Sequence, residues 1–102
     1  MVSQLIKDMA AGDRNAILRG IQSTGTSDKS CGICFAAIHR IRDSEMIAAI
    51  RAAKEDADLV YAYRISDFAI AALDILGVEK YTGDNELIQT LIHSKFAFLE
   101  GL

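Results

Sequence analysis

The chain of 102 residues contains no proline, no tryptophan and only two cysteines. With no proline to interrupt it, a composition dominated by alanine, leucine and isoleucine favours helix. Two cysteines are too few for the disulfide framework of a small secreted domain, so a reducing, cytoplasmic location is expected. No apolar run approaches the roughly 20 residues of a membrane span, and charges interrupt the first residues too early for a signal peptide. We therefore expect no membrane association.

Charge is low overall but unevenly distributed. The hydrophobic fraction of 51% is enough for a core, and the length predicts one domain over residues 1–102. A net charge of −3 and a pI near 5.2 argue against direct nucleic-acid binding. Residues 1–54 carry eight Lys or Arg and five Asp or Glu, whereas residues 55–86 carry two and eight. This asymmetry either steers a basic partner to the acidic region or reflects solvated helix faces.

Apolar residues at helical spacing recur along most of the chain, separated by short polar stretches that can cap helices. The stretch Thr24–Ser30 reads as a loop, and Leu59–Tyr63 fits either a strand or a helical turn. The predicted helices cover about residues 2–11, 13–23, 27–42, 43–55, 66–77 and 84–99, with caps at Asp13, at Ser27 or Asp28, at Asp43 or Ser44, near Ser66, and at Asp84.

A two-helix pattern occurs twice. Phe35-Ala-Ala-Ile38 precedes Asp43-Ser-Glu-Met-Ile-Ala-Ala-Ile50, and Ile70-Ala-Ala-Leu73 precedes Asp84-Asn-Glu-Leu-Ile-Gln-Thr-Leu91. The first blocks are offset by 35 residues and the second by 41. A helical pair repeating at this spacing is typical of α-solenoids.

These blocks resemble HEAT-type repeats. The size, acidity and repeat style of the chain also resemble the small helical-repeat immunity proteins of bacterial toxin systems, including contact-dependent growth inhibition. The first resemblance implies an all-α fold, a short α-solenoid of about two HEAT-like repeats with five to six helices. The second implies a protein that binds and neutralises a cognate toxin.

Two groups of residues could carry other chemistry. Cys31 and Cys34 form a Cys-x-x-Cys motif at a predicted helix start, where the helix dipole lowers thiol pKa and supports redox exchange. A thioredoxin-like site needs a preceding strand, however, and here a polar loop is expected, so packing is the simpler explanation. With His39 and His93 the cysteines could supply four metal ligands, but their spacing matches no common zinc signature. We expect neither a metal nor a cofactor.

Paired carboxylates are the remaining catalytic candidates. Asp67 and Asp74 are seven residues apart and share one helical face, a spacing that could serve acid–base chemistry. No glycine-rich phosphate loop or other pocket signal accompanies them. We therefore expect no enzyme activity.

The joint between the two repeat units, which we define as residues 55–68 (EDADLVYAYRISDF), combines acids with aromatic residues. Tyr61 and Tyr63 are two apart, so an extended chain would point both the same way. Tyrosine is favoured at interface hot spots, and acids can pair with a basic partner. Alternatively, one tyrosine packs into the core and the acids keep the loop soluble.

We interpret the joint as a binding surface for a basic protein, which the resemblance makes a toxin domain, for example a nuclease. The following helix would present Asp67 and Asp74 beside this surface, and Glu79 and Tyr81 would extend it. The candidate partner-binding residues are Glu55, Asp56, Asp58, Tyr61, Tyr63, Asp67 and Asp74. The alternatives are a scaffold or adaptor, a homodimer through Phe96–Leu99, and a thiol redox protein.

Overall fold

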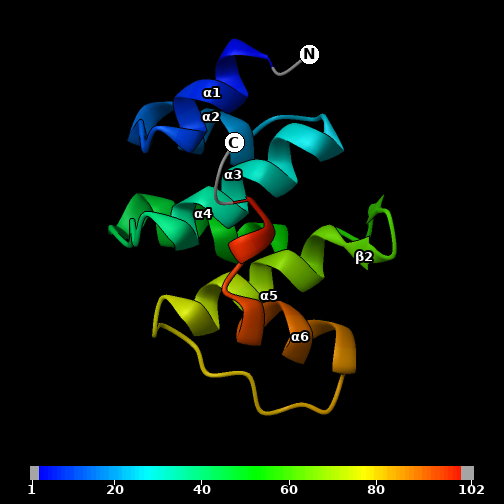
Figure 1. The fold of residues 1–102 in the computed structure, drawn as a ribbon. Helices are drawn as coiled ribbons and strands as arrows, with labels where there is room; N and C mark the ends of the chain where they lie inside the picture. The colour runs from blue at the N-terminus through cyan, green and yellow to red at the C-terminus, as the bar shows by residue number, and fades with distance from the viewer. Residues whose placement is uncertain (1–2, 100–102) are drawn as a thin grey trace.

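A computed structural model describes residues 3–99 (Figure 1). The described residues form six α-helices, a two-stranded antiparallel hairpin and one short 3-10 helix, so the all-α class is confirmed. The elements are α1 (Gln4–Ala10), α2 (Arg14–Ile21), α3 (Thr26–Ile38), α4 (Ser44–Ala53), β1 (Leu59–Val60), β2 (Tyr63–Arg64), α5 (Ile65–Ile75), α6 (Glu86–Ser94) and the 3-10 helix η1 (Ala97–Leu99). No helix within these residues is both long enough and apolar enough to cross a membrane.

Side-chain caps explain where several helices begin. Asp13 accepts a hydrogen bond from the Ala16 amide at the start of α2, and Asp43 accepts one from the Met46 amide at the start of α4. Both caps were predicted. The prediction at Asp84 was wrong by one residue, because Asn85 caps α6. An asparagine oxygen serves this position as well as a carboxylate does.

Helix α3 differs from its predicted boundaries at both ends. Residues 26–30 are helical rather than a loop, Gly25 replaces Ser27 or Asp28 as the N-cap, and the helix ends at Ile38 rather than near Arg42. The polar first turn is held by packing against α2. A Cβ on Gly20 would come within 3.1 Å of the Asp28 carbonyl oxygen, so the two backbones approach closely there. Tertiary contact has overridden a composition that suggests a loop.

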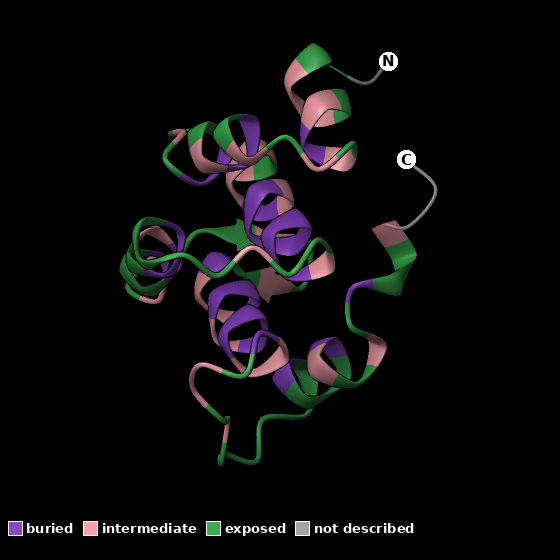
Figure 2. Ribbon diagram, turned by 90° about the vertical axis from the view of Figure 1, so that its left-hand side faces the viewer, coloured by how far each residue is buried: buried purple, intermediate pink, exposed green. Residues whose placement is uncertain are grey.

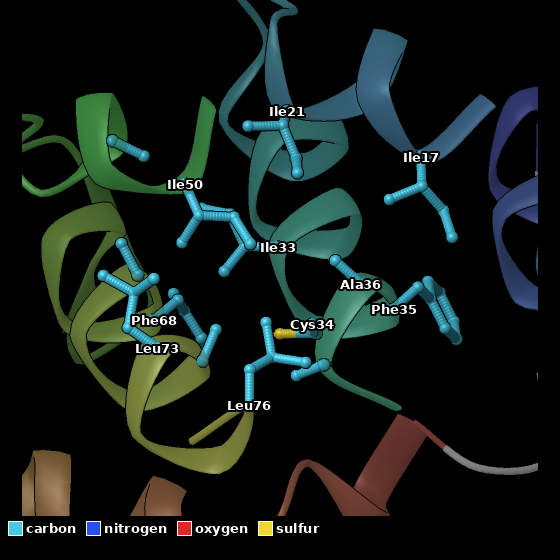
Figure 3. Close-up of a cluster of buried hydrophobic side chains, with 14 of the residues drawn as sticks. Ile17, Ile21, Ile33, Cys34, Phe35, Ala36, Ile50, Phe68, Leu73 and Leu76 are labelled. Atoms are coloured by element: carbon cyan, nitrogen blue, oxygen red, sulfur yellow. The ribbon is translucent and has the colours of Figure 1, made fainter. Parts of the chain in front are cut away.

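The same helix forms the centre of the molecule. Every residue from Gly32 to Ala37 is buried, so α3 is covered around most of its circumference. Gly32 allows the approach to α2, since a Cβ there would lie 2.7 Å from the Ile21 amide nitrogen. The other side of α3 faces α5, and the two helices carry most of the buried residues at the middle of the fold (Figure 2). Figure 3 shows Ile33, Cys34 and Leu73 within this cluster.

The two sequence repeats do not have the same neighbours. Helix α4 packs on α5 and α2, whereas α6 packs on α5. Met46 of α4 is fully buried, while Leu87, which matches it in the sequence blocks, is 41% exposed. Because Asn85 rather than Asp84 caps α6, Leu87 lies two positions after its cap and Met46 three positions after its own. The alanine pairs of the first helices, by contrast, are buried in both units.

The joint forms a hairpin rather than a helical turn. Strand β1 pairs antiparallel with β2, with Leu59 opposite Arg64 and Val60 opposite Tyr63. At its base, the carbonyl oxygens of Asp56 and Asp58 accept hydrogen bonds from the Ser66 and Ile65 amides, both at 2.9 Å. The hairpin is therefore tied to the first turn of α5 by backbone hydrogen bonds.

Candidate protein-binding site

The tip of the hairpin presents one tyrosine to solvent. Tyr61 is 97% exposed, and its backbone φ is +59°. This region of φ favours glycine, and a non-glycine residue held there costs about 1–3 kcal/mol. Leu59, before the turn, is 65% exposed. A large aromatic side chain thus occupies a turn position where it contributes little packing and strains the backbone.

Tyr63 has a different environment. It is half-buried, with its ring 5.4 Å from that of Phe68 between ring centroids. Phe68 in turn lies 6.2 Å from the buried Phe96. The chain is not extended between Tyr61 and Tyr63, because it turns there, so the two side chains have different environments and only Tyr63 packs against the core. Tyr63 anchors the base of the hairpin, and of the two tyrosines only Tyr61 is exposed.

The acids of the joint also divide into two kinds. Asp56 pairs with Lys29 of α3 at 2.7 Å and accepts a hydrogen bond from the Asp58 amide. These hydrogen bonds, that from Lys29 first, lower the pKa of Asp56. Glu55 and Asp58 are exposed, and neither belongs to an ion pair within the described part of the chain. Asp56 is thus a structural link between α3 and the joint, while Glu55 and Asp58 are free to meet a basic partner.

Asp67 and Asp74 do not form an exposed acidic face, contrary to the prediction. Both are partly buried and both bind backbone amides. Asp67 accepts a hydrogen bond from the Arg64 amide at 2.8 Å, at the start of α5. Asp74 accepts one from the Tyr81 amide, also at 2.8 Å. Their carboxylates organise the two ends of α5 and are not available as a pair for a partner.

The loop after α5 is not an extension of the hairpin surface. Glu79 pairs with Arg51 at 2.6 Å and with Lys54 at 3.0 Å, and the Tyr81 hydroxyl accepts a hydrogen bond from the Asn85 amide. This loop and the hairpin lie at opposite ends of α5 (Figure 1). Eleven helical residues separate the two ends by about 16 Å. The prediction that Glu79 and Tyr81 enlarge the joint surface is wrong.

The cysteines lie inside α3 rather than at its start. Because the helix begins at Thr26, Cys31 is in its second turn, beyond the free amides that would stabilise a thiolate. Burial, and then the Asp28 carboxylate, raises the pKa of Cys31. Burial raises the pKa of Cys34 further, and its sulfur is directed from α3 toward α5 (Figure 3). The low-pKa thiol that the redox interpretation requires is not present at either position.

The four candidate metal ligands are not assembled. Nε2 of His39 lies 2.9 Å from the Ala10 carbonyl oxygen, at the end of α3 remote from Cys31. His93 is on α6. Within residues 3–99, no three His, Cys, Asp or Glu side chains gather closely enough to hold a metal ion.

A pocket beside the hairpin was not predicted. It has a volume of about 210 Å³ and is lined by residues of α3, the hairpin, α5 and η1. Phe98 of η1, 63% exposed, lines it together with Tyr61. From the sequence, the Phe96–Leu99 stretch was predicted only as a self-association segment. No feature of the neighbouring sequence indicates that Phe98 shares a pocket with Tyr61, 37 residues earlier. The lining residues are Ser27, Ser30, Cys31, Cys34, Val60, Tyr61, Phe68, Phe98 and Leu99.

Two exposed aromatic side chains, Tyr61 and Phe98, line one pocket, and the exposed residues Glu55, Asp58 and Leu59 belong to the same joint as Tyr61. We refer to these five residues together as the hairpin surface. Comparison with protein-family models, with curated proteins and with solved structures found no match to this chain.

Proposed function

We propose that the protein is a non-enzymatic binding module whose hairpin surface docks a basic protein. The proposal rests on the exposure of Tyr61, which is 97% exposed at a turn position of positive φ. Glycine would adopt this backbone conformation without strain. Aromatic side chains that project from a fixed backbone, with few torsions to restrain, are favoured as interface anchors.

The charges around the tip suit a basic partner. Glu55 and Asp58 are exposed, and Asp28 lies on the first turn of the neighbouring helix. Arg64 is the one cation of the hairpin itself, and Lys29 is already paired with Asp56. The local excess of carboxylates would steer a basic surface to the site and speed association.

The resemblance to immunity proteins makes a cognate toxin our proposed partner, and a nuclease suits the charge. Nuclease active sites are basic because they hold phosphates, so an acidic surface can cover such a groove. This function would be exerted in the cytoplasm. Tyr61 would dominate the dissociation rate, and the flanking acids the association rate.

A binding titration against the product of the adjacent upstream gene tests the proposal, because immunity proteins are commonly encoded beside their toxins. We expect tight binding that weakens as salt is raised. Tyr61→Gly should weaken it about 30-fold, which corresponds to about 2 kcal/mol, without loss of folding. Tyr81→Phe, in the other acidic loop, is the matched control and should bind like the wild type.

Self-association is the second candidate, and the exposed apolar pair of Tyr61 and Phe98 favours it. A homodimer, or a scaffold built from one, would bury both side chains against a second copy. Sedimentation velocity across protein concentration separates the two candidates. A monomer at all concentrations, with binding to the upstream product, supports the first; a dimer lost in Phe98→Ser supports the second and contradicts the first.

A further inference from the structure

We propose that the surface pocket lined by α3, the hairpin, α5 and η1 is a socket for one uncharged apolar side chain of the partner protein. This inference rests on the proposed function and specifies what the partner inserts. Three segments far apart in sequence build the pocket, and Tyr61 and Phe98 flank it where they emerge from the surface. The socket is therefore continuous with the hairpin surface.

The walls of the pocket offer no charge and no free buried polar group. None of the nine lining residues carries an ionised side chain. The Ser30 hydroxyl donates to the Ser27 carbonyl oxygen at 3.0 Å, so its proton is already used. Within the described residues, no buried side-chain nitrogen or oxygen lacks a hydrogen-bond partner. A charged group entering this pocket would meet no countercharge on the lining side chains, whereas an apolar group would gain by burial.

The two thiols strengthen this selectivity. Cys31 and Cys34 both line the pocket, one partly and the other fully buried. Because burial raises the pKa of both, the sulfurs stay protonated near neutral pH. Protonated thiols behave as small apolar groups with a polarisable sulfur, which packs well against aromatic rings.

The size of the pocket limits the occupant to one side chain. An apolar cavity of about 150 Å³ is known to accept benzene, so about 210 Å³ admits a ring or a branched aliphatic group such as those of Phe and Leu. Glu55 and Asp58 remain at the exposed hairpin surface, where they can pair with Lys or Arg on the same partner segment. The expected ligand is thus an aromatic or aliphatic side chain flanked by basic residues.

A plug variant tests the socket without disturbing the core. Ser27 is exposed on the first turn of α3, and only its backbone oxygen has a recorded hydrogen bond. Ser27→Leu places an aliphatic chain across the pocket and favours helix. Ser44→Leu on the first turn of α4, which does not line the pocket, is the matched control. Both variants should retain the wild-type circular dichroism spectrum.

The first measurement uses toluene as the probe and the full chain alone. Toluene at millimolar concentration should shift the NMR signals of Val60 and Phe98, and slow alkylation of Cys31 by iodoacetamide severalfold, as located by peptide mapping. Ser27→Leu should abolish both effects, and Ser44→Leu should not. Absence of shifts in the wild type, or unchanged shifts in Ser27→Leu, would overturn the socket.

The second measurement uses the partner identified by the salt-dependent titration. Ser27→Leu should weaken binding about 10-fold or more while leaving the salt dependence unchanged, because the acids are intact. If Tyr61→Gly weakens binding and Ser27→Leu does not, the proposed function stands and the socket is wrong. If toluene binds but neither the upstream product nor any basic protein does, the assignment of the pocket to a protein side chain is overturned. Dimerisation abolished by Ser27→Leu would equally overturn it, in favour of a second copy.

Discussion

Two acidic loops flank helix α5: the joint before it and the loop after it. Both contain tyrosine, but their side chains have opposite environments in the structure. In the loop after α5, Tyr81 and Glu79 are bound to their own chain through Asn85, Arg51 and Lys54. In the joint before α5, Tyr61 reaches into solvent. The two loops lie at opposite ends of the helix (Figure 1).

The comparison shows that acids and tyrosines together do not define a binding surface. What matters is whether their hydrogen-bonding and charged groups already have partners within the fold. In the loop after α5, the Glu79 carboxylate and both the amide and the hydroxyl of Tyr81 are engaged within the fold. At the hairpin tip, the Tyr61 side chain is exposed to solvent. Four predictions would break or sharpen this contrast.

The largest expected change in the free energy of unfolding comes from a substitution at the base of the hairpin. Phe68 is buried and lies between Tyr63 and Phe96. Phe68→Ala should lower the free energy of unfolding by about 3–5 kcal/mol, measured by urea denaturation, because it leaves a cavity at the start of α5. Phe98→Ala is the matched control and should cost less than about 1 kcal/mol. Similar losses for both would mean that Phe98 is packed rather than exposed.

The loop after α5 should be sensitive where the hairpin tip is not. Asp74→Ala removes the acceptor of the Tyr81 amide, and we expect a loss of about 1–2 kcal/mol in the free energy of unfolding. Tyr61→Ala should stay within about 0.5 kcal/mol of the wild type, since its ring contacts mainly solvent. Thermal and urea unfolding of both variants check the contrast. Equal destabilisation would place Tyr61 in a structural role.

A smaller effect of opposite sign is expected at the tip itself. Tyr61→Gly should raise the free energy of unfolding by about 0.5–1 kcal/mol, because relief of the positive φ exceeds the added chain entropy of glycine. Combined with weaker partner binding, this gain would show that the tyrosine is kept at the expense of stability. The urea midpoints of Tyr61→Gly and the wild type provide the measurement. A lower midpoint for Tyr61→Gly would contradict the claim that Tyr61 strains the backbone.

The smallest effect concerns acid stability. The hydrogen bonds from Arg51 and then Lys54 lower the pKa of Glu79 from its usual 4.5. Glu79 therefore stabilises the fold above its unfolded pKa, and this contribution disappears as pH falls through the lower folded pKa. Glu79→Gln should flatten the decline of the melting temperature on acidification, whereas Glu55→Gln should not. The effect will be modest, since the ion pairs are solvent-exposed and screened.

The sequence repeats illustrate how far pattern alone predicts packing. Ala36, Ala37, Ala71 and Ala72 are buried as the repeated blocks suggest. Met46 and Leu87 match in the sequence blocks, yet only Met46 is buried. The reason is that Asp43 caps α4 whereas Asn85, one position later in its block, caps α6, so the buried residue three positions after the cap is Ile88. Periodicity indicates which face of a helix is apolar, but not the residue at which the helix begins.

The sequence by itself determined the helical class, most helix positions and the caps at Asp13 and Asp43. Such features depend on hydrogen bonds and spacings within about four residues, which can be read locally. Only the tertiary structure decided that Thr26 starts a helix. It also decided that Asp67 and Asp74 accept hydrogen bonds from backbone amides, and that Phe98 and Tyr61 line the same pocket. The start of α3 and the meeting of Phe98 with Tyr61 depend on contacts between segments far apart in sequence. The unusual composition of the joint is visible in the sequence. Packing in the tertiary structure decides which of its side chains stay exposed.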